Sequence, residues 1–155
     1  MKLVFEHYFA ASPDALFRFH ERYENLVLLQ RGWSSFRLIS HPDAVRLGGV
    51  FRVQEGFGPL FIDLAFEHHL FEPAHRFGER QISGPFHCFV HTHEFEERPG
   101  GALLRDTLDF TVPLWLGGSL TEKIVVAPKL RQWFAYRHAE LEKIIAEGLL
   151  TRTVS

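Results

Sequence analysis

The sequence predicts an α+β protein in which a curved antiparallel sheet of about seven strands wraps round one long C-terminal helix, with two short helices between the first two strands. Strand-like runs bounded by turn residues fill the middle of the chain, and helical periodicity persists only near its two ends. The connections between the runs are too short for parallel crossovers, so neighbouring strands must be antiparallel. Because nothing else in the sequence can cover the sheet, the last helix must lie in its concavity.

The N-terminal part of the chain predicts one strand followed by helix. Residues 2–10 form an apolar run typical of a strand. Ser12, Pro13 and Asp14 then supply an N-cap, a first-turn proline and a first-turn acid, which is the pattern that begins a helix. Apolar residues recur at helical spacing beyond this point. We therefore expect one or two short helices that end near Arg31 and Gly32.

Six further runs, separated by residues typical of turns, predict the remaining strands. In chain order they are FRLIS, GGVFRVQEGF, PLFIDLAFEHHLF, HRFGERQIS, FHCFVHTHEFEER and ALLRDTLDFTV. Together with the first run they have the spacing of an antiparallel meander.

The last helix is predicted from a capping box and an apolar stripe. Ser119 and Glu122 stand three residues apart, as in a capping box, and the helix should then continue to about Gly148. Pro128 should bend it, because proline has no amide proton for the internal hydrogen bond. We expect residues 151–155 to be a loose tail, which leaves residues 1–150 as a single domain. The stripe contains Leu120, Ile124, Ala127, Leu130, Phe134, Leu141 and Ile145.

The composition restricts the classes of function. A hydrophobic fraction of 46%, with 16 Phe, excludes disorder and predicts an apolar interior. The formal net charge is −2 and the basic residues are scattered, so neither nucleic acid nor an anionic membrane is an expected partner. No apolar run approaches the roughly 18 residues of a membrane helix, and Glu6 and His7 interrupt any signal-peptide core. The single cysteine, Cys88, fits a cytoplasmic location, and the oligomeric state, monomer or dimer, stays open.

Histidines are concentrated in the run that begins at Phe86. Side chains alternate between the two faces of a strand, so His91 and His93 share a face with Phe89 and Phe95. In the next run the apolar face must point inward, and this face includes Asp106 along with Leu104, Leu108 and Phe110. If residues 98–101 close a tight hairpin, His93 lies opposite Asp106, and His91 lies opposite Leu108.

Pairing in the other direction brings a second carboxylate to the same face. A turn at Ser83-Gly84-Pro85 would place His91 opposite Phe77 and Phe89 opposite Glu79. Arg137 falls within the apolar stripe of the last helix, about 60° from Phe134 at ~100° per residue. The expected interior therefore holds five polar side chains amid phenylalanines: Glu79, His91, His93, Asp106 and Arg137.

A family resemblance rests on five motifs that occur in order along the chain. They are Phe77-Gly78-Glu79-Arg80-Gln81; Gly84-Pro85-Phe86 with Phe89, His91, His93 and Phe95; Gly100-Gly101; Leu104, Asp106, Leu108, Phe110 and Pro113; and Phe134-Ala135-Tyr136-Arg137. These motifs resemble a bacterial subgroup of the START-like, polyketide-cyclase-like ligand-binding superfamily (SRPBCC), and the similarity spans nearly the whole chain. Phe89, Glu79 and Phe110 stand where the subgroup usually has Trp, Asp and Tyr.

The resemblance implies the helix-grip fold, with a cavity between the sheet and the C-terminal helix. The superfamily contains lipid carriers, hormone receptors, aromatase/cyclases and chaperone co-activators, so the fold does not select one function. We expect the cavity to bind a small hydrophobic or aromatic molecule that carries a polar group. The expected apolar contacts are Phe77, Phe89, Phe95, Leu108, Phe110 and Phe134, and the expected polar contacts are Glu79, His91, His93, Asp106 and Arg137.

Other interpretations of these side chains stay open. An imidazole oriented by a carboxylate is typical of acid/base catalysis, so a cyclase or dehydratase could use His93, Asp106 and His91, with Arg137 holding an oxyanion. His-x-His on a strand, with Asp106 and Glu79 nearby, could also hold a metal ion. The preferred assignment has no cofactor and no metal. A third class is a protein-interaction module.

Overall fold

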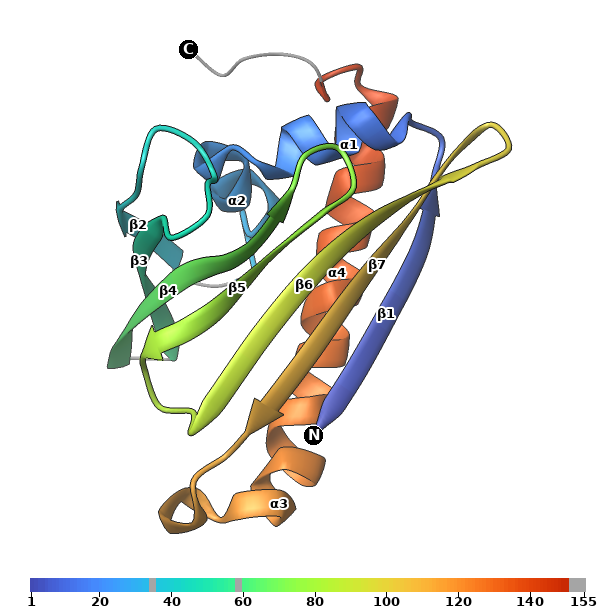
Figure 1. Cartoon of the computed structure of the whole chain (residues 1–155). Helices are drawn as coiled ribbons and strands as arrows, with labels where there is room; N and C mark the ends of the chain where they lie inside the picture. The colour runs from blue at the N-terminus through green and yellow to red at the C-terminus, as the bar shows by residue number, and fades with distance from the viewer. Residues whose placement is uncertain (34–35, 58–59, 151–155) are drawn as a thin grey trace.

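The computed structural model describes residues 1–33, 36–57 and 60–150, which form one antiparallel sheet and a set of helices (Figure 1). The strands are β1 (Lys2–Phe9), β2 (Phe36–Ser40), β3 (Val50–Phe57), β4 (Leu60–Glu72), β5 (Arg76–Ser83), β6 (Cys88–Arg98) and β7 (Gly101–Thr111). The helical elements are α1 (Pro13–His20), α2 (Tyr23–Leu29), η1 (Leu114–Leu116), α3 (Gly118–Thr121), η2 (Glu122–Val126) and α4 (Ala127–Ala146). The predicted α+β class and order of elements are confirmed.

The sheet has seven strands in the order β1-β7-β6-β5-β4-β3-β2. The chain therefore runs as a meander from β2 to β7, and β1 closes the far edge by pairing with β7. Helix α4 crosses one face of this curved sheet, as the helix-grip fold requires, and α1 and α2 lie across one end of it (Figure 1). Among the described helices, none is long and apolar enough to cross a membrane.

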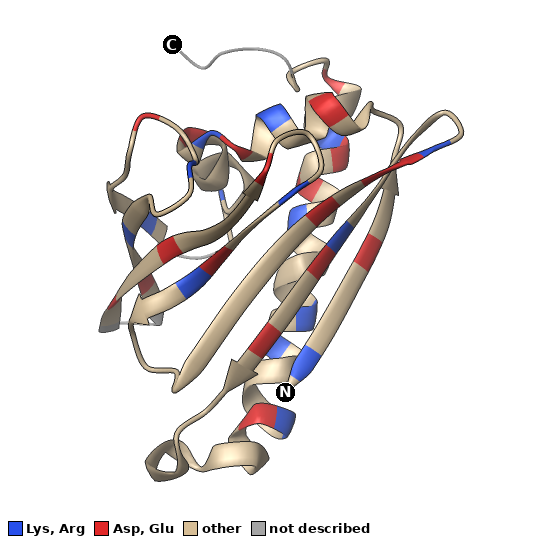
Figure 2. Ribbon diagram, in the orientation of Figure 1, with Lys and Arg blue, Asp and Glu red and all other residues tan. Residues whose placement is uncertain are grey.

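The two faces of the sheet differ in the way that strand alternation predicts. Charged residues recur along β1, β6 and β7 (Figure 2), and several of them pair across these strands. Arg105 Nε lies 2.6 Å from Glu6 Oε1, and the guanidinium also approaches Glu94 and Glu96. The opposite face of the same strands packs against α4 and holds the buried residues.

The registers decide which side chains meet on that inner face. β6 pairs with β7 as predicted, with His93 opposite Asp106 and His91 opposite Leu108. The predicted register between β5 and β6 is wrong by two residues, because Glu79 lies opposite His91 and Phe77 lies opposite His93. The connection is longer than the tight turn we expected, since β5 ends at Ser83 and β6 starts only at Cys88. A shift of two residues keeps every side chain on its predicted face.

The start of the C-terminal helix differs from the sequence prediction. Ser119 and Glu122 form no capping box: α3 begins after Gly117 without a side-chain cap. Glu122 is buried instead, where its Oε1 accepts a hydrogen bond from the backbone N–H of Val112 at 2.9 Å, and its Oε2 lies 3.7 Å from the N-terminal amine. The carboxylate thus joins the end of β7 to the helix.

A wide π-helical turn at η2 explains two further features of this segment. The N–H of Ala127 donates to the carbonyl of Glu122, five residues back, and Pro128, which has no N–H, follows within the first turn of α4. The extra residue in the turn rotates the preceding helical face. For this reason Leu120 and Ile124, predicted as part of the buried stripe, are 64% and 65% exposed.

The interior contains two apolar clusters with a polar layer between them. One cluster gathers Phe17, Phe77, Phe95 and other residues near α1 and α2. The second is centred on Leu108, Phe110 and Phe134. On each strand the residues that separate the two clusters are polar: His91 and His93 on β6, Asp106 on β7, and, facing them from α4, Arg137 and His138.

Candidate functional site

Four buried side chains from three neighbouring strands form a ring at the centre of the polar layer. Glu79 comes from β5, His91 and His93 from β6, and Asp106 from β7. Each is at most 9% exposed. They lie together because His91 and His93 are two residues apart on one strand, while Glu79 and Asp106 lie opposite them on the strands at either side.

Both histidines bridge the same two carboxylates. His91 Nδ1 lies 2.9 Å from Glu79 Oε1, and His91 Nε2 donates to Asp106 Oδ1 at 3.0 Å. His93 Nε2 lies 3.5 Å from Glu79 Oε1, and His93 Nδ1 lies 2.7 Å from Asp106 Oδ1. This last contact is a close ionic one without the alignment of a hydrogen bond. His93 thus contacts Asp106, which the sequence placed opposite it, and His91 contacts Glu79, which the sequence placed on the same face.

The helices add three more polar side chains to the ring. His138 of α4 donates from Nε2 to Asp106 Oδ2 at 3.3 Å. His20 of α1 lies beside His93, with 5.8 Å between ring centroids. Arg137 of α4 stacks on the rings of Trp133 and Phe134, with its guanidinium carbon 5.0 and 5.4 Å from their centroids.

Arg137 is buried on α4, where it could form an ion pair between the helix and the sheet. As a helix-to-sheet ion pair it would need a carboxylate partner, and none lies within ion-pair distance in the described part of the chain. The side chain is nevertheless 6% exposed and feels the charges of Asp106 and Glu79. Arg137 is therefore a buried cation held by aromatic rings.

The carboxylates set the charges within the ring. Burial by itself lowers the pKa of His93, but Glu79 and Asp106 outweigh burial and raise this pKa to about 9. Burial raises the pKa of each carboxyl group, yet the surrounding histidines hold the pKa of Glu79 and that of Asp106 well below their ordinary values. In this geometry, at neutral pH, His93 is positively charged and both carboxylates are negatively charged.

The neighbouring histidines are shifted in the opposite direction. Burial and the charge on His93 lower the pKa of His20 to about 3, and burial lowers the pKa of His68. Both imidazoles are neutral at neutral pH. The site therefore combines one charged histidine with neutral ones a few ångströms away.

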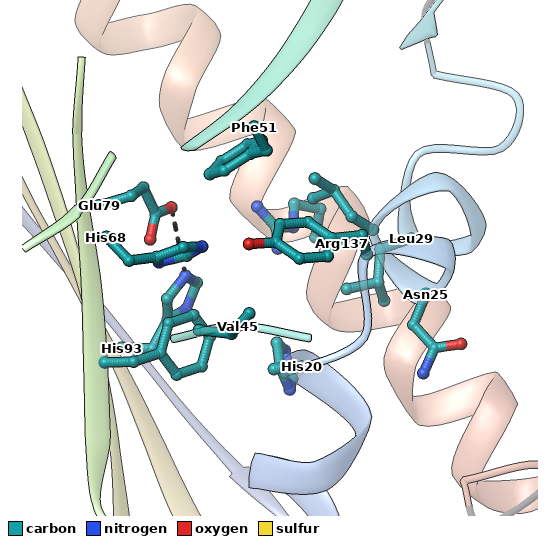
Figure 3. Close-up of a pocket in the computed structure, with 12 residues that line it drawn as sticks. His20, Asn25, Leu29, Val45, Phe51, His68, Glu79, His93 and Arg137 are labelled. Atoms are coloured by element: carbon teal, nitrogen blue, oxygen red, sulfur yellow. Dashed lines mark ion pairs between the residues drawn. The ribbon is translucent and has the colours of Figure 1, made fainter. Parts of the chain in front are cut away.

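A small polar chamber adjoins the ring on the side of α1 and α2 (Figure 3). Its volume is about 40 Å³, and its walls include His20, Tyr23, His68, Glu79 and His93. Several of the buried polar atoms here have no hydrogen-bond partner among the described residues: the Tyr23 hydroxyl, both ring nitrogens of His68, and Glu79 Oε2. A chamber of this size is large enough for one or two water molecules.

A larger and mainly apolar cavity lies on the other side of Glu79. It has a volume of about 250 Å³. Aromatic and aliphatic side chains supply most of its wall, and polar groups come from Glu79, His91 and Arg137 together with Gln30, Glu55, Gln81 and Lys129. Val125, which is 55% exposed, also lines the cavity and marks a place where it reaches the surface. Its apolar walls include Trp33, Phe36, Phe51, Val53, Leu64, Phe66, Phe86, Phe89, Val126, Leu130 and Trp133.

The structure separates the predicted contact residues into two groups. Glu79 and Arg137 line both cavities, Phe89 and His91 line the large one, and Phe77 and His93 line the small one. The other predicted residues are buried behind these walls without lining either cavity: Phe95, Asp106, Leu108, Phe110 and Phe134.

Sequence reasoning missed many of the cavity residues. Trp33, Phe51, Phe66 and Trp133 come from a loop, two strands of the other half of the sheet and the last helix. The aromatic residues of β3 and β4 alternate with polar ones, which was a usable signal for their inward face. Nothing in the sequence indicated which of them would stand opposite α4, since this depends on how the sheet curves.

Glu79, His91 and His93 also have the arrangement of metal ligands. Each offers one ligand atom, and these atoms lie within 4.8 Å of one another. Asp106 contacts both histidines through their other nitrogen atoms.

Comparison with known proteins supports the fold. No protein-family model and no curated protein matches the chain. A solved structure from Chromobacterium violaceum has a TM-score of 0.74 at 12% identity, covering 92% of this chain and 95% of that one. A structure from Rhodobacter sphaeroides has a TM-score of 0.71 at 20% identity, covering 94% and 92%. Ara h 8.0201 has a TM-score of 0.63 at 12% identity, covering 91% and 97%.

At 12–20% identity, these similarities show that the chain shares the overall fold of these structures.

Proposed function

We propose that the protein binds a small hydrophobic or aromatic molecule carrying a polar group, as a carrier or sensor in the cytoplasm, and that it belongs to the START-like subgroup that its motifs resemble. The cavity of about 250 Å³ carries this proposal. It combines apolar walls with a few convergent polar groups, which is the usual composition of a small-molecule site. Its volume is below the roughly 300–1,000 Å³ of sites for drug-sized ligands, so the ligand is small.

The polar group of the ligand would lie next to Glu79, His91 and Arg137, because these side chains face the large cavity. Arg137 is the strongest candidate for this contact, since it has no ion-pair partner among the described residues. A phenol, an enol or a carboxylic acid on an aromatic ring would satisfy it. The aromatic walls, including Phe66, Phe89 and Trp133, would contact the ring system.

Titration with 1-aminoanthracene, a neutral aromatic probe with one polar group, tests the cavity. Trp33 and Trp133 line the cavity, so binding should quench tryptophan emission and increase that of the probe. Leu130→Trp fills part of the cavity and should weaken binding by about tenfold or more, equivalent to at least ~1.4 kcal/mol. Ile124→Trp is the matched control, because Ile124 is 65% exposed and lies outside the cavity wall.

Two results would contradict the proposal. One is the absence of saturable binding by the unmodified protein. The other is an equal loss of affinity in Leu130→Trp and Ile124→Trp, which would place the probe on the surface. Native mass spectrometry of protein purified from cells would then identify a natural ligand through its added mass.

A cyclase or dehydratase is a second candidate, and the Arg137 guanidinium favours it, because a buried cation beside a cavity can stabilise an oxyanion. In this second proposal Glu79 and His91 take the acid/base role in preference to His93, because they line the large cavity and His93 does not. Catalysis would be established if the Glu79→Gln variant no longer converted a compound that the unmodified protein turns over, while its affinity for that compound stayed the same.

A further inference from the structure

In the ring, both histidines are oriented in the same way, with one ring nitrogen toward Asp106 and the other toward Glu79. Asp106 Oδ1 lies 3.0 Å from His91 Nε2 and 2.7 Å from His93 Nδ1, so one carboxylate oxygen holds one nitrogen of each imidazole. The opposite nitrogens, His91 Nδ1 and His93 Nε2, both face Glu79 Oε1. The nitrogens that do not contact Asp106 therefore point toward the same place, beside Glu79. The Asp106 carboxylate lies behind the two imidazoles.

This is the arrangement in which histidines bind metal ions. A metal-bound imidazole almost always donates its other N–H to a carboxylate or carbonyl, which fixes the tautomer and the orientation of the ring. Asp106 accepts this hydrogen bond from His91 and lies 2.7 Å from the corresponding nitrogen of His93 as a close ionic contact. The two lone pairs that remain, and the Glu79 carboxylate, would form a set of two nitrogens and one oxygen.

The distances between the three ligand atoms suit a small cation. Two ligands at about 2.0–2.1 Å from one metal ion lie about 3.0–3.4 Å apart, depending on the coordination geometry. Glu79 Oε1 lies 2.9 Å from His91 Nδ1 and 3.5 Å from His93 Nε2, close to this spacing, and all three ligand atoms lie within 4.8 Å of one another.

A second observation points to a ligand at the same place. Glu79 Oε2 is buried and has no hydrogen-bond partner in the described part of the chain, although a buried carboxylate oxygen is costly to leave unpaired. Coordination through both oxygens would satisfy it.

We propose that Glu79, His91 and His93 bind one divalent transition-metal ion of the Zn²⁺ or Fe²⁺ class, with Asp106 as the residue that orients both histidines. Two imidazoles exclude Mg²⁺ and Ca²⁺, which prefer oxygen ligands. Three protein ligands leave open coordination positions. Glu79 borders both cavities, His91 the large one and His93 the small one, so a water molecule or a ligand oxygen could reach the ion. This site does not depend on the proposed organic ligand.

Co²⁺ is the probe for the test, because it takes the place of Zn²⁺ and its visible absorption reports nitrogen ligation. Tag-free protein would be dialysed against EDTA and titrated with Co²⁺ while absorbance is recorded. We expect saturation at about one ion per chain. Glu79→Gln and His91→Phe should each weaken binding at least ~100-fold, and Asp106→Asn should weaken it about 10- to 100-fold.

The matched control is His69→Phe, since His69 lies on β4, is exposed and is outside the ring. Its Co²⁺ affinity should equal that of the unmodified protein. The proposal is wrong if the unmodified apo protein shows no saturable Co²⁺ absorption, or if His69→Phe loses as much affinity as His91→Phe. The absence of Co²⁺ binding by the unmodified protein would rule out the metal site even if a ring variant failed to fold. Neither of these results would affect the expected binding of 1-aminoanthracene, so the metal site and the organic-ligand site are tested separately.

Discussion

Asp106 is a buried carboxylate that contacts three histidines at once. It is 2% exposed and lies within 3.3 Å or less of three histidines, His91, His93 and His138. An ionised carboxylate can only accept hydrogen bonds, and its two oxygens offer about four lone pairs. Asp106 therefore has enough acceptor sites for all three imidazoles, and its negative charge offsets the charge that His93 carries.

Replacing Asp106 by Asn should destabilise the protein strongly. Loss of one partner leaves buried charge uncompensated, which typically costs about 3–5 kcal/mol. Asp109→Asn, on the exposed face of the same strand, should change the stability by less than about 0.5 kcal/mol. Urea unfolding of both variants in the presence of EDTA measures the difference without a metal contribution. Equal stabilities would show that the carboxylate of Asp106 contributes little.

At the level of elements, strand alternation carried most of what the sequence could predict about the site. The periodicity of β6 and β7 placed His91, His93 and Asp106 on one face, and the register error of two residues at Glu79 left that face unchanged. The ring was thus predictable from local pattern. His20 and His138 were not, because their approach depends on the angles at which α1 and α4 cross the sheet.

The C-terminal helix shows where local pattern is insufficient. Ser119 and Glu122 have the spacing of a capping box, yet Glu122 turns inward and binds the N–H of Val112. Satisfying a buried amide at the end of β7 competes with capping the helix. Whether Glu122 caps the helix or binds Val112 depends on the proximity of β7, which local sequence patterns do not describe. The π-helical turn then moves Leu120 and Ile124 off the buried face.

Glu122→Ala should reveal the importance of this link. The substitution leaves the N–H of Val112 buried without its acceptor, at a cost of about 1–3 kcal/mol. Lys123→Ala, on the exposed side of the same turn, is the control, and its effect should be below about 0.5 kcal/mol. Thermal unfolding followed by circular dichroism compares the two. A Glu122→Ala variant as stable as Lys123→Ala would mean that water replaces the carboxylate.

Across the whole molecule, a charged layer divides the apolar interior. Phe77 and Phe95 belong to one cluster, Leu108 and Phe134 to the other, and the ring lies between them. Desolvating this many charges is expensive, and their mutual attraction repays the cost only in part. A continuous apolar core would be the simpler way to stabilise a chain of 155 residues. The layer is therefore explained better by binding than by stability.

If the layer serves binding, replacing all of it with apolar residues should change the free energy of unfolding little, although replacing Asp106 alone should lower it strongly. The variant Glu79→Leu, His91→Leu, His93→Leu, Asp106→Val and Arg137→Met replaces the charges with apolar groups of comparable size. Such replacements of buried ion pairs are often neutral or stabilising by about 1–4 kcal/mol. We expect urea unfolding to give a stability equal to or above that of the unmodified protein, together with complete loss of Co²⁺ binding. If the five-residue variant is as unstable as Asp106→Asn, the layer is a structural requirement of the fold, and its presence in place of an apolar core would need no ligand to explain it.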